Sequence, residues 1–581
     1  MHKKSTLFIV LMVLSLLIFS AIPALSQEPT TFYGAWPYSL PPDGHFNSFA
    51  SRALSMGNYQ DLMEPPSAVY IWNTGEYEGF LASEFGFDAD NNYLVTMRDG
   101  VTWSDGTPVT AQDLVVTYQV GRLLNWSEWA FIDRVEAVDD MTVKFTLNSP
   151  GYSVERSILV TAVRPASVYG DFGARAQALM DEGRASADDP DWAALLDELT
   201  NFRPETYVAS GPYVLDPASI SDASVTLVKN EGGLFADRVR FDRVVLWNGE
   251  TEAVTPLVAN GDVWYATHGF PPATEASFVE QGIDIIRGPF YNGPAIYVNH
   301  AIYPLNRVEV RQAIAYAVDR EQNGFVSLGE SGVAVEYMMG FSDNLAELWL
   351  SEETLAALNT YDYDPDAGAA LLEGIGFTKG EDGVWIDDQG NRLAFELIFP
   401  AEWTDWAAAA ENAVAALNDF GFEITARGVQ WQQQEQDVYD NNFQLAIRNW
   451  GVGNPFPGFS YLQPYNRYNG QGVLAGEATG GGMRFDPNVT YSGGEINVYD
   501  TALAANAGLD VEQQRVYVEQ LAVSFNELLP CIPLWERYGN NPLNRQYLDA
   551  PPSDDPIWLN AGADFFMTYL IMTGGIGPAE M

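Results

Sequence analysis

Residues 97–118 read MRDGVTWSDGTPVTAQDLVVTY, a short run that joins a tight turn to the start of an apolar helix. The Asp105-Gly106 pair favours a turn, because both residue types adopt turn geometry at little cost. Thr110 stands three residues before Asp113, which is the spacing of a capping box at the start of the helix that follows. Asp105 is therefore expected to be a turn residue rather than a catalytic one.

Outside this run, strand-like and helix-like segments alternate irregularly along the chain. Short runs rich in β-branched and aromatic residues indicate strands at 142–148, 225–230, 243–248 and 395–400. Amphipathic patterns indicate helices at 111–124, 307–320 and 405–421, and an Asp-Pro start predicts another within 363–377. This mixture predicts an α/β fold with more than one sheet.

The composition limits the class of protein. A chain of 581 residues exceeds what one hydrophobic core usually serves, so two or three lobes are expected. The 16 Trp, 29 Tyr and 31 Phe in a chain that is 47% hydrophobic exclude a disordered protein. A formal net charge of −49 repels phosphates and anionic lipid, so we expect no nucleic-acid partner and no adhesion to a membrane surface.

The N-terminus has the pattern of a cleavable export signal. Lys3 and Lys4 precede an apolar run over residues 7–19, and a small-residue triplet at 24–26 ends the segment. Residues 1–26 are therefore predicted to be a cleavable signal peptide, which places the mature chain outside the cytoplasm: in the periplasm, at the cell surface or secreted. An uncleaved anchor helix is the alternative, but the run is short for a bilayer. No cysteine follows the signal, so no lipobox cysteine is expected.

The sequence lacks the constellations that carry catalysis. His45, His268 and His300 are scattered, without the close spacing of zinc or nickel sites, and neither a G-x-S-x-G elbow nor a P-loop occurs. Cys531, the only cysteine, has an apolar context and is expected to be a buried, unreactive thiol. We therefore predict a protein that is not an enzyme and has no metal or cofactor. A secreted glycoside hydrolase and a receptor for a nickel chelate stay open as alternatives.

The order of several motifs is more specific than any one of them. Residues 97–118 are followed by VEAVDDMTVKFTLNSP (135–150), SGPYVL (210–215), YVNHAIYPLNRVEVRQAIAYAVDR (297–320), the run over 361–400 and LPCIPLW (529–535). In this order, over about residues 60–540, the chain resembles the family 5 extracellular solute-binding proteins of bacterial ABC importers. That family includes receptors for peptides, nickel and oligosaccharides.

The resemblance implies an α/β fold with two lobes, the periplasmic-binding-protein clamshell (type II, cluster C-like), with an extra subdomain in lobe I. It implies lobe I over 27–75, 210–293 and 530–581, an accessory subdomain over 76–209, and lobe II over 294–529. The hinge would lie near residues 293 and 529. Such receptors close on a solute and deliver it to permease subunits in the membrane, so we expect a monomer that performs no covalent chemistry.

Aromatic and amide side chains in loops are the candidates for ligand contact. Sugars stack their apolar faces on indole rings, and their hydroxyls pair with amides and carboxylates. Trp403 and Trp406 follow the strand at 395–400, at a strand end where ligands of open α/β sheets bind. The full set of predicted ligand-binding residues is Trp36, Asn47, Trp403, Trp406, Trp450, Asn454 and Phe456.

The stretch NWGVGNPFPGFSYL (449–462) bears on the class of ligand. Peptide receptors of the family typically carry an aspartate shortly after the aromatic residue that ends this strand, and its carboxylate pairs with the α-ammonium of the peptide. Here Gly453 stands at or near the expected position, and no acidic residue occurs between Trp450 and Glu477. We therefore predict an oligosaccharide ligand. A peptide ligand is the alternative, and a role in presenting ligand to a membrane sensor stays open.

Overall fold

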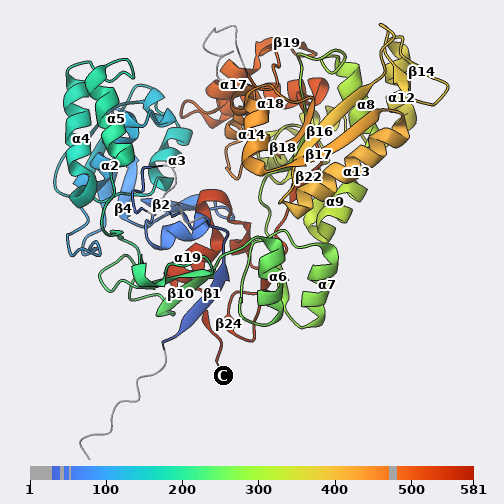
Figure 1. Cartoon of the computed structure of the whole chain (residues 1–581). Coiled ribbons are helices and arrows are strands. Elements are labelled where there is room, and N and C mark those ends of the chain that lie inside the picture. The colour runs from blue at the N-terminus through green and yellow to red at the C-terminus, as the bar shows by residue number, and fades with distance from the viewer. Residues whose placement is uncertain (1–28, 39–44, 51–53, 470–480, 581) are drawn as a thin grey trace, which may run out of the picture.

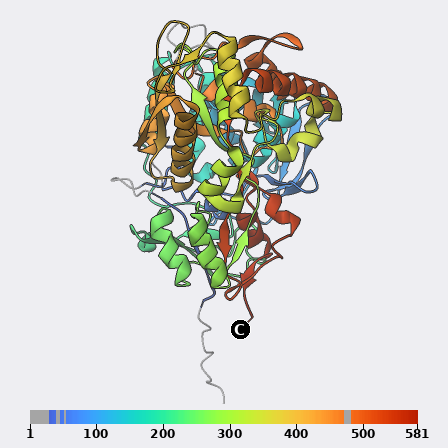
Figure 2. The same ribbon diagram turned by 90° about the vertical axis from the view of Figure 1, so that its right-hand side faces the viewer.

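The computed structural model describes residues 29–38, 45–50, 54–469 and 481–580. The predicted signal peptide, residues 1–26, lies outside these ranges. Figure 1 shows a lower body that carries both β1 (Thr31–Ala35) and α19 (Phe566–Thr573), a helical subdomain at the upper left and a larger second body at the upper right. In Figure 2, the green segment near residue 260 again lies at the bottom and the orange segments of the second body lie above it.

The lower body is built on a mixed sheet of β8 (Tyr213–Leu215), β9 (Ser224–Lys229), β10 (Arg243–Trp247), β1, β23 (Asn541–Leu543) and β11 (Asp284–Ile286). β1 runs parallel to β10, whereas β10 with β9 and β9 with β8 form antiparallel pairs. Tyr265 bridges Gly34 to Leu543 and so joins β1 to β23. Helices α6 (Thr251–Ala259) and α7 (Pro272–Glu280) pack on this sheet through a buried cluster that includes Ala35 and Phe278.

The second body holds a five-stranded sheet in the order β17 (Glu423–Val429), β16 (Ala394–Pro400), β18 (Leu445–Trp450), β12 (Gly293–Val298) and β21 (Cys531–Pro533). β16 is parallel to β17 and β18, while β12 is antiparallel to β18 and β21. All six residues of β12 are buried, as expected for a central strand with both faces covered. The helices around this core include α8 (Val308–Ala317), α9 (Arg320–Leu328), α13 (Thr404–Phe420), α14 (Trp431–Tyr439) and α18 (Val511–Leu528).

The subdomain combines a sheet in the order β4 (Ala82–Phe87), β5 (Tyr93–Met97), β7 (Thr142–Leu147) and β6 (Ile132–Ala137) with helices α2 (Ala111–Leu123), α4 (Ala166–Asp181) and α5 (Pro190–Asn201). The capping box predicted for α2 is confirmed, because the Thr110 backbone N–H donates to the Asp113 carboxylate at 2.7 Å. Asp105 accepts a hydrogen bond from the Thr107 backbone N–H at 2.9 Å, and Gly106 has a φ of 85°. Asp105 is thus a turn residue, as predicted.

A buried ion pair ties the subdomain to the C-terminal part of the lower body. Arg156, in α3 (Tyr152–Val160), donates to Asp564 at 2.7 Å, and both side chains are almost completely enclosed. Asp564 also accepts hydrogen bonds from the Tyr70 backbone N–H at 2.8 Å and from the Trp72 indole at 3.0 Å. Three distant parts of the chain therefore meet at one carboxylate.

The sheets indicate one change to the predicted division into lobes. β21 pairs with β12 in the second sheet, and β22 (Trp535–Arg537) pairs with β13 (Gly332–Ala334). After β22, the C-terminal segment of the chain joins the sheet of the lower body at β23. We therefore propose that the two crossings lie at residues 287–292 and 538–540, so that the second follows the position predicted near 529. The other predicted boundaries stay proposals.

Cys531 lies within β21, fully buried and without a disulfide partner, as predicted. Burial raises the pKa of its thiol far above the ordinary value, so the reactive thiolate is disfavoured. Within the part of the chain that the structure describes, no helix combines the length and apolar character needed to cross a bilayer.

Candidate functional site

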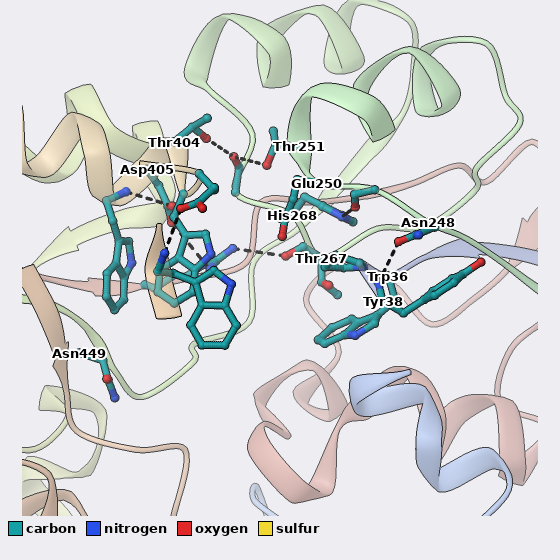
Figure 3. A pocket seen from close by; sticks show the side chains of 18 of the residues that line it. Trp36, Tyr38, Asn248, Glu250, Thr251, Thr267, His268, Thr404, Asp405 and Asn449 are labelled. Carbon is teal, nitrogen blue, oxygen red and sulfur yellow. Dashed lines mark hydrogen bonds and ion pairs between the residues drawn. The ribbon is translucent and has the colours of Figure 1, made fainter. Parts of the chain in front are cut away.

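A cavity of about 740 Å³ lies between the two bodies, and loops from both of them line it. The lower body contributes the segments after β1 and β10 and residues 267–269. The second body contributes the segments after β16 and β17 and the end of β18, while Asn292 and Arg537 lie next to the crossings. The carboxyl ends of the parallel strands of each sheet thus gather at one place, where open α/β sheets bind their ligands. Figure 3 shows Trp36 and Tyr38 on one side, facing Asp405 on the other.

Indole rings form much of the wall of this cavity. Trp403 is half-buried; its ring meets that of Trp406 edge-on at 4.9 Å between centroids and stacks on Trp431 at 6.0 Å. Trp406 is buried and anchors this group in the core of the second body. Trp36 lines the cavity from the lower body, beside Tyr38, whose backbone N–H donates to Asn248 Oδ1 at 2.8 Å. Both sides of the cavity therefore offer flat apolar surface.

The same cavity is negatively charged. Glu250, Glu402 and Asp405 line it, with Arg537 as the only cationic side chain among the lining residues described. Burial raises the pKa of Glu250, and the neighbouring charges of Glu402 and Asp405 raise it further. Burial lowers the pKa of His268 to about 4, so its imidazole is neutral at pH 7. The aromatic walls thus enclose a polar floor with excess negative charge.

Direct contacts join the two bodies at one edge of the cavity. The Thr404 hydroxyl, from the start of α13, donates to the Gly269 carbonyl at 3.2 Å, and the Thr251 hydroxyl donates to the same oxygen at 3.4 Å. Arg537 donates to the Thr267 carbonyl at 3.3 Å. Figure 3 marks these contacts with dashed lines; those of Thr404 and Arg537 hold the rims together, whereas that of Thr251 lies within the lower body.

A second cavity, of about 250 Å³, continues the first and shares Trp36 and Asn292 with it. Its other walls include Asn58, Phe290 and Gly453, and no charged side chain is among its lining residues in the described chain. The two cavities are therefore adjacent, one with charged walls and the other with neutral, partly aromatic walls.

Three of the predicted ligand-binding residues come together and the other four lie elsewhere. Trp36, Trp403 and Trp406 all line the first cavity. Asn47 is completely buried against the subdomain, where its side-chain amide donates to the carbonyl of Leu199 in α5 at 2.7 Å. The residue types that suit a binding loop thus also serve packing, and Asn47 has a sufficient structural role.

Trp450, Asn454 and Phe456 belong to the neutral stretch at 449–462 but do not line either cavity. Trp450 is 1% exposed, and its indole donates to the Trp535 carbonyl at 3.2 Å. Asn454 Oδ1 accepts the Phe456 backbone N–H at 2.9 Å, which forms a turn. Phe456 packs edge-on against Trp349. From this stretch, Gly453 lines the second cavity.

Sequence reasoning missed Glu250, Asp405, Trp431 and Arg537. Glu250 and Trp431 follow the ends of β10 and β17, so the strand-end signal that selected Trp403 could also have found them. Arg537 reaches the cavity because the C-terminal segment crosses between the two bodies directly after it. No local sequence pattern predicts that crossing. Among the described residues, no group of three or more histidine, cysteine, aspartate or glutamate side chains is arranged to hold a metal ion.

Glu536 precedes Arg537 and is enclosed beside the C-terminal crossing. Its carboxylate accepts hydrogen bonds from Ser342 Oγ at 2.7 Å and from Asn344 Nδ2 at 2.9 Å, and the residue is 2% exposed. Burial raises its pKa from 4.5 to about 8. Between these two values the folded chain holds a proton that the unfolded chain has released, so this group contributes less stability as the pH rises.

We expect the Glu536→Gln variant to be more stable than the wild type above pH 8 and the difference to fade as the pH falls, because glutamine stays neutral at every pH. Urea unfolding at about pH 5, 7 and 9 measures this difference, whose slope cannot exceed roughly 1.4 kcal/mol per pH unit for one proton. Glu353→Gln, exposed in α11 (Glu352–Ala357), is the control. A difference between Glu536→Gln and wild type that does not vary with pH would contradict the prediction.

The comparisons with known proteins agree with this architecture. A family model for bacterial extracellular solute-binding proteins, family 5 (middle region), matches residues 76–472. The oligopeptide-binding protein OppA of Bacillus subtilis is 26% identical over 468 residues, 75% of this chain and 76% of that protein. A periplasmic oligopeptide-binding protein of an ABC transporter from Thermotoga maritima has a TM-score of 0.77 at 20% identity, over 95% of this chain and 100% of its own.

The same Thermotoga maritima protein with bound mannohexaose has a TM-score of 0.74 at 20% identity, over 96% of this chain and 100% of its own. At this level of identity the solved structures support the two-lobed fold alone. The family model matches more than half of the chain, in agreement with the resemblance drawn from the motifs. The chain therefore belongs to the bacterial extracellular solute-binding proteins of family 5, which are solute receptors of ABC importers.

Proposed function

We propose that this chain binds an oligosaccharide in the cleft between its lobes and delivers it to the permease subunits of an ABC importer. The observation that carries the proposal is the presence of indoles from both lobes at one cavity, Trp36 on one side and Trp403 and Trp431 on the other. Facing indoles suit the apolar faces of a sugar chain, and the polar floor suits its hydroxyls. Export by the signal at residues 1–26 and a monomeric state belong to the same proposal.

The shape of the cleft also supports an oligomeric ligand. The neutral second cavity extends the first through Trp36 and Asn292, so a linear chain of units can occupy both. A fold relative from Thermotoga maritima is known with bound mannohexaose, which is a ligand of this kind. Residue 453 is a glycine and no charged side chain among the described residues lines the second cavity, so this neutral end offers no carboxylate for the α-ammonium of a peptide.

A peptide is the second candidate, because the relative from Bacillus subtilis is named as an oligopeptide-binding protein. The carboxylates of the first cavity also favour it, since they could pair with a peptide ammonium group. A glycoside hydrolase is the third, because those carboxylates lie in a cleft.

A thermal-shift screen separates these candidates. Cello-, manno- and xylo-oligosaccharides are compared with di- to pentapeptides, since a ligand that binds only the folded chain stabilises it by ~2.7 kcal/mol at a hundredfold excess over Kd. We expect at least one oligosaccharide series to raise Tm and to be recovered intact by chromatography. A response to peptides alone would contradict the proposed ligand, and release of shorter sugars would contradict a receptor.

We expect the Trp403→Ala variant to bind the oligosaccharide at least about fivefold more weakly, which corresponds to about 1 kcal/mol of lost stacking. Trp403 is half-buried, so its removal should leave the fold intact. Isothermal titration calorimetry measures the affinity. Trp264→Ala is the matched control, because Trp264 is also half-buried but stacks on Tyr547, away from either cavity. Equal affinities for Trp403→Ala and wild type would remove Trp403 from the site.

A further inference from the structure

The first cavity has more negative charge than its own residues can neutralise. Glu250, Glu402 and Asp405 face a single cation, Arg537, and His268 is neutral at pH 7. Glu250 belongs to the lower body and Glu402 to the second body, yet the Glu402 charge is close enough to raise the pKa of Glu250. Closure of the lobes on a neutral ligand would remove water from these carboxylates without replacing the lost solvation, which is unfavourable.

Asp405 shows the imbalance most clearly. The residue is 5% exposed, and its Oδ1 accepts a hydrogen bond from the Trp406 backbone N–H at 3.0 Å. Its Oδ2 accepts no hydrogen bond, and Arg537 Nη1 lies 3.7 Å away, beyond hydrogen-bond distance. Arg537 is also engaged elsewhere, because it donates to a backbone carbonyl and lies over the Phe290 ring at 5.1 Å. A buried carboxylate oxygen is therefore left without a donor.

His268 supplies a second acceptor without a donor. Its Nε2 lies 2.9 Å from the Gly249 carbonyl oxygen, which can only accept, so Nε2 carries the proton. In this neutral tautomer Nδ1 is an acceptor, and it has no hydrogen-bond partner although the residue is 7% exposed. His268 and Asp405 both line the first cavity, from opposite lobes. Among the described residues, each of these two side chains therefore lacks a hydrogen-bond donor beside the first cavity.

We propose that the first cavity recognises a protonated amine of the ligand, with Asp405, Glu250 and Glu402 as counter-charges and His268 Nδ1 as a further acceptor. An ammonium group offers three donors and one positive charge, which matches this set. The inference rests on the proposed function for the location of the ligand, and it specifies the ligand as an amine-bearing one. The amine belongs either to an amino-sugar unit of an oligosaccharide or to the N-terminus of a peptide.

Calorimetry with matched pairs of ligands tests the proposal. The pairs are a glucosamine oligomer with its N-acetylated form, and a tetrapeptide with its N-acetylated form, in a mildly acidic buffer that keeps the amines protonated. Acetylation removes the charge and keeps the rest of each chain. We expect the free amine of one pair to bind at least about tenfold more tightly than its acetylated form.

Glu250→Gln should reduce that preference at least threefold, because it removes one counter-charge while it keeps the shape of the side chain. Glu252→Gln is the matched control, since Glu252 is exposed in the first turn of α6 and does not line the cavity. This variant should prefer the free amine over the acetylated ligand as strongly as the wild type does. Circular dichroism checks that each variant is folded.

The outcomes separate this inference from the proposed function. A preference for the free glucosamine oligomer supports both amine recognition and the proposed oligosaccharide ligand. A preference for the free tetrapeptide alone supports amine recognition and contradicts the proposal of an oligosaccharide ligand. Neutral oligosaccharides that bind as tightly as their amine-bearing counterparts contradict amine recognition and leave the proposed function in place. An undiminished preference in Glu250→Gln contradicts the assigned residues, and the absence of binding by all four ligands contradicts the inference.

Discussion

The Asp564→Asn variant is expected to lose about 3–5 kcal/mol of the free energy of unfolding. The substitution keeps the shape of the side chain but leaves the guanidinium of Arg156 buried without a counter-charge. Its cost is therefore that of an unpaired buried charge rather than that of a lost hydrogen bond. Urea unfolding followed by tryptophan fluorescence measures the change, with the linear dependence of stability on denaturant as the basis.

A double-mutant cycle makes this prediction specific. Arg156→Met alone should also destabilise the chain, and Arg156→Met with Asp564→Asn should cost less than the sum of the two single changes, since neither charge is then left unpaired. Asp549→Asn, which breaks the exposed pair of Asp549 with Arg240, should leave the unfolding midpoint nearly unchanged. Additive single costs would show that the buried pair does not act as a unit.

The Trp450→Ala variant is expected to lose about 3–5 kcal/mol of the free energy of unfolding, because it opens a cavity in the core of the second body. It also leaves the Trp535 carbonyl without its indole donor. Trp450→Phe keeps most of the buried ring and should cost clearly less. Both variants are measured by urea unfolding, without ligand.

A comparison of Trp450→Ala with Trp403→Ala distinguishes a role in core packing from a role in ligand binding for these two tryptophans, which the sequence predicted to contact the ligand. Trp450→Ala should change stability strongly, whereas Trp403→Ala should change affinity with little effect on stability. A Trp450→Ala variant with the unfolding midpoint of the wild type and a weakened ligand affinity would contradict this assignment. Such a result would support the prediction from the sequence that Trp450 contacts the ligand.

Local sequence patterns were sufficient to predict much of the fold. The capping box at Thr110 and the helix predicted over 405–421 are both present, the latter as α13, which Gly421 ends in a left-handed conformation with φ 112°. Such signals are readable because their partners lie within a few residues of each other. The motif order likewise identified the family, since each motif keeps its place in the chain whatever its neighbours in space.

Only some of the residues that line the candidate site could be predicted from the sequence. Trp403 and Trp406 were selected because residues after parallel strands share one edge of a sheet, and Trp36 was selected as an aromatic residue in a loop; all three line the first cavity. Asn47 and Trp450 carry the same residue types, but their partners are the carbonyls of Leu199 and Trp535, which lie 152 and 85 residues away. A polar or aromatic side chain in a loop does not reveal whether such a distant partner covers it.

The sequence by itself thus determined the family, the two-lobed α/β class and the neutral character of the stretch at 449–462. Only the tertiary structure decided that this stretch places Gly453 at the cleft and buries Trp450 behind it. Only the tertiary structure brought Glu250 of one lobe near Glu402 of the other and left one oxygen of Asp405 without a hydrogen-bond donor. The physical reason is that charge balance and burial depend on which residues from distant parts of the chain meet, and those meetings follow from the packing of whole sheets.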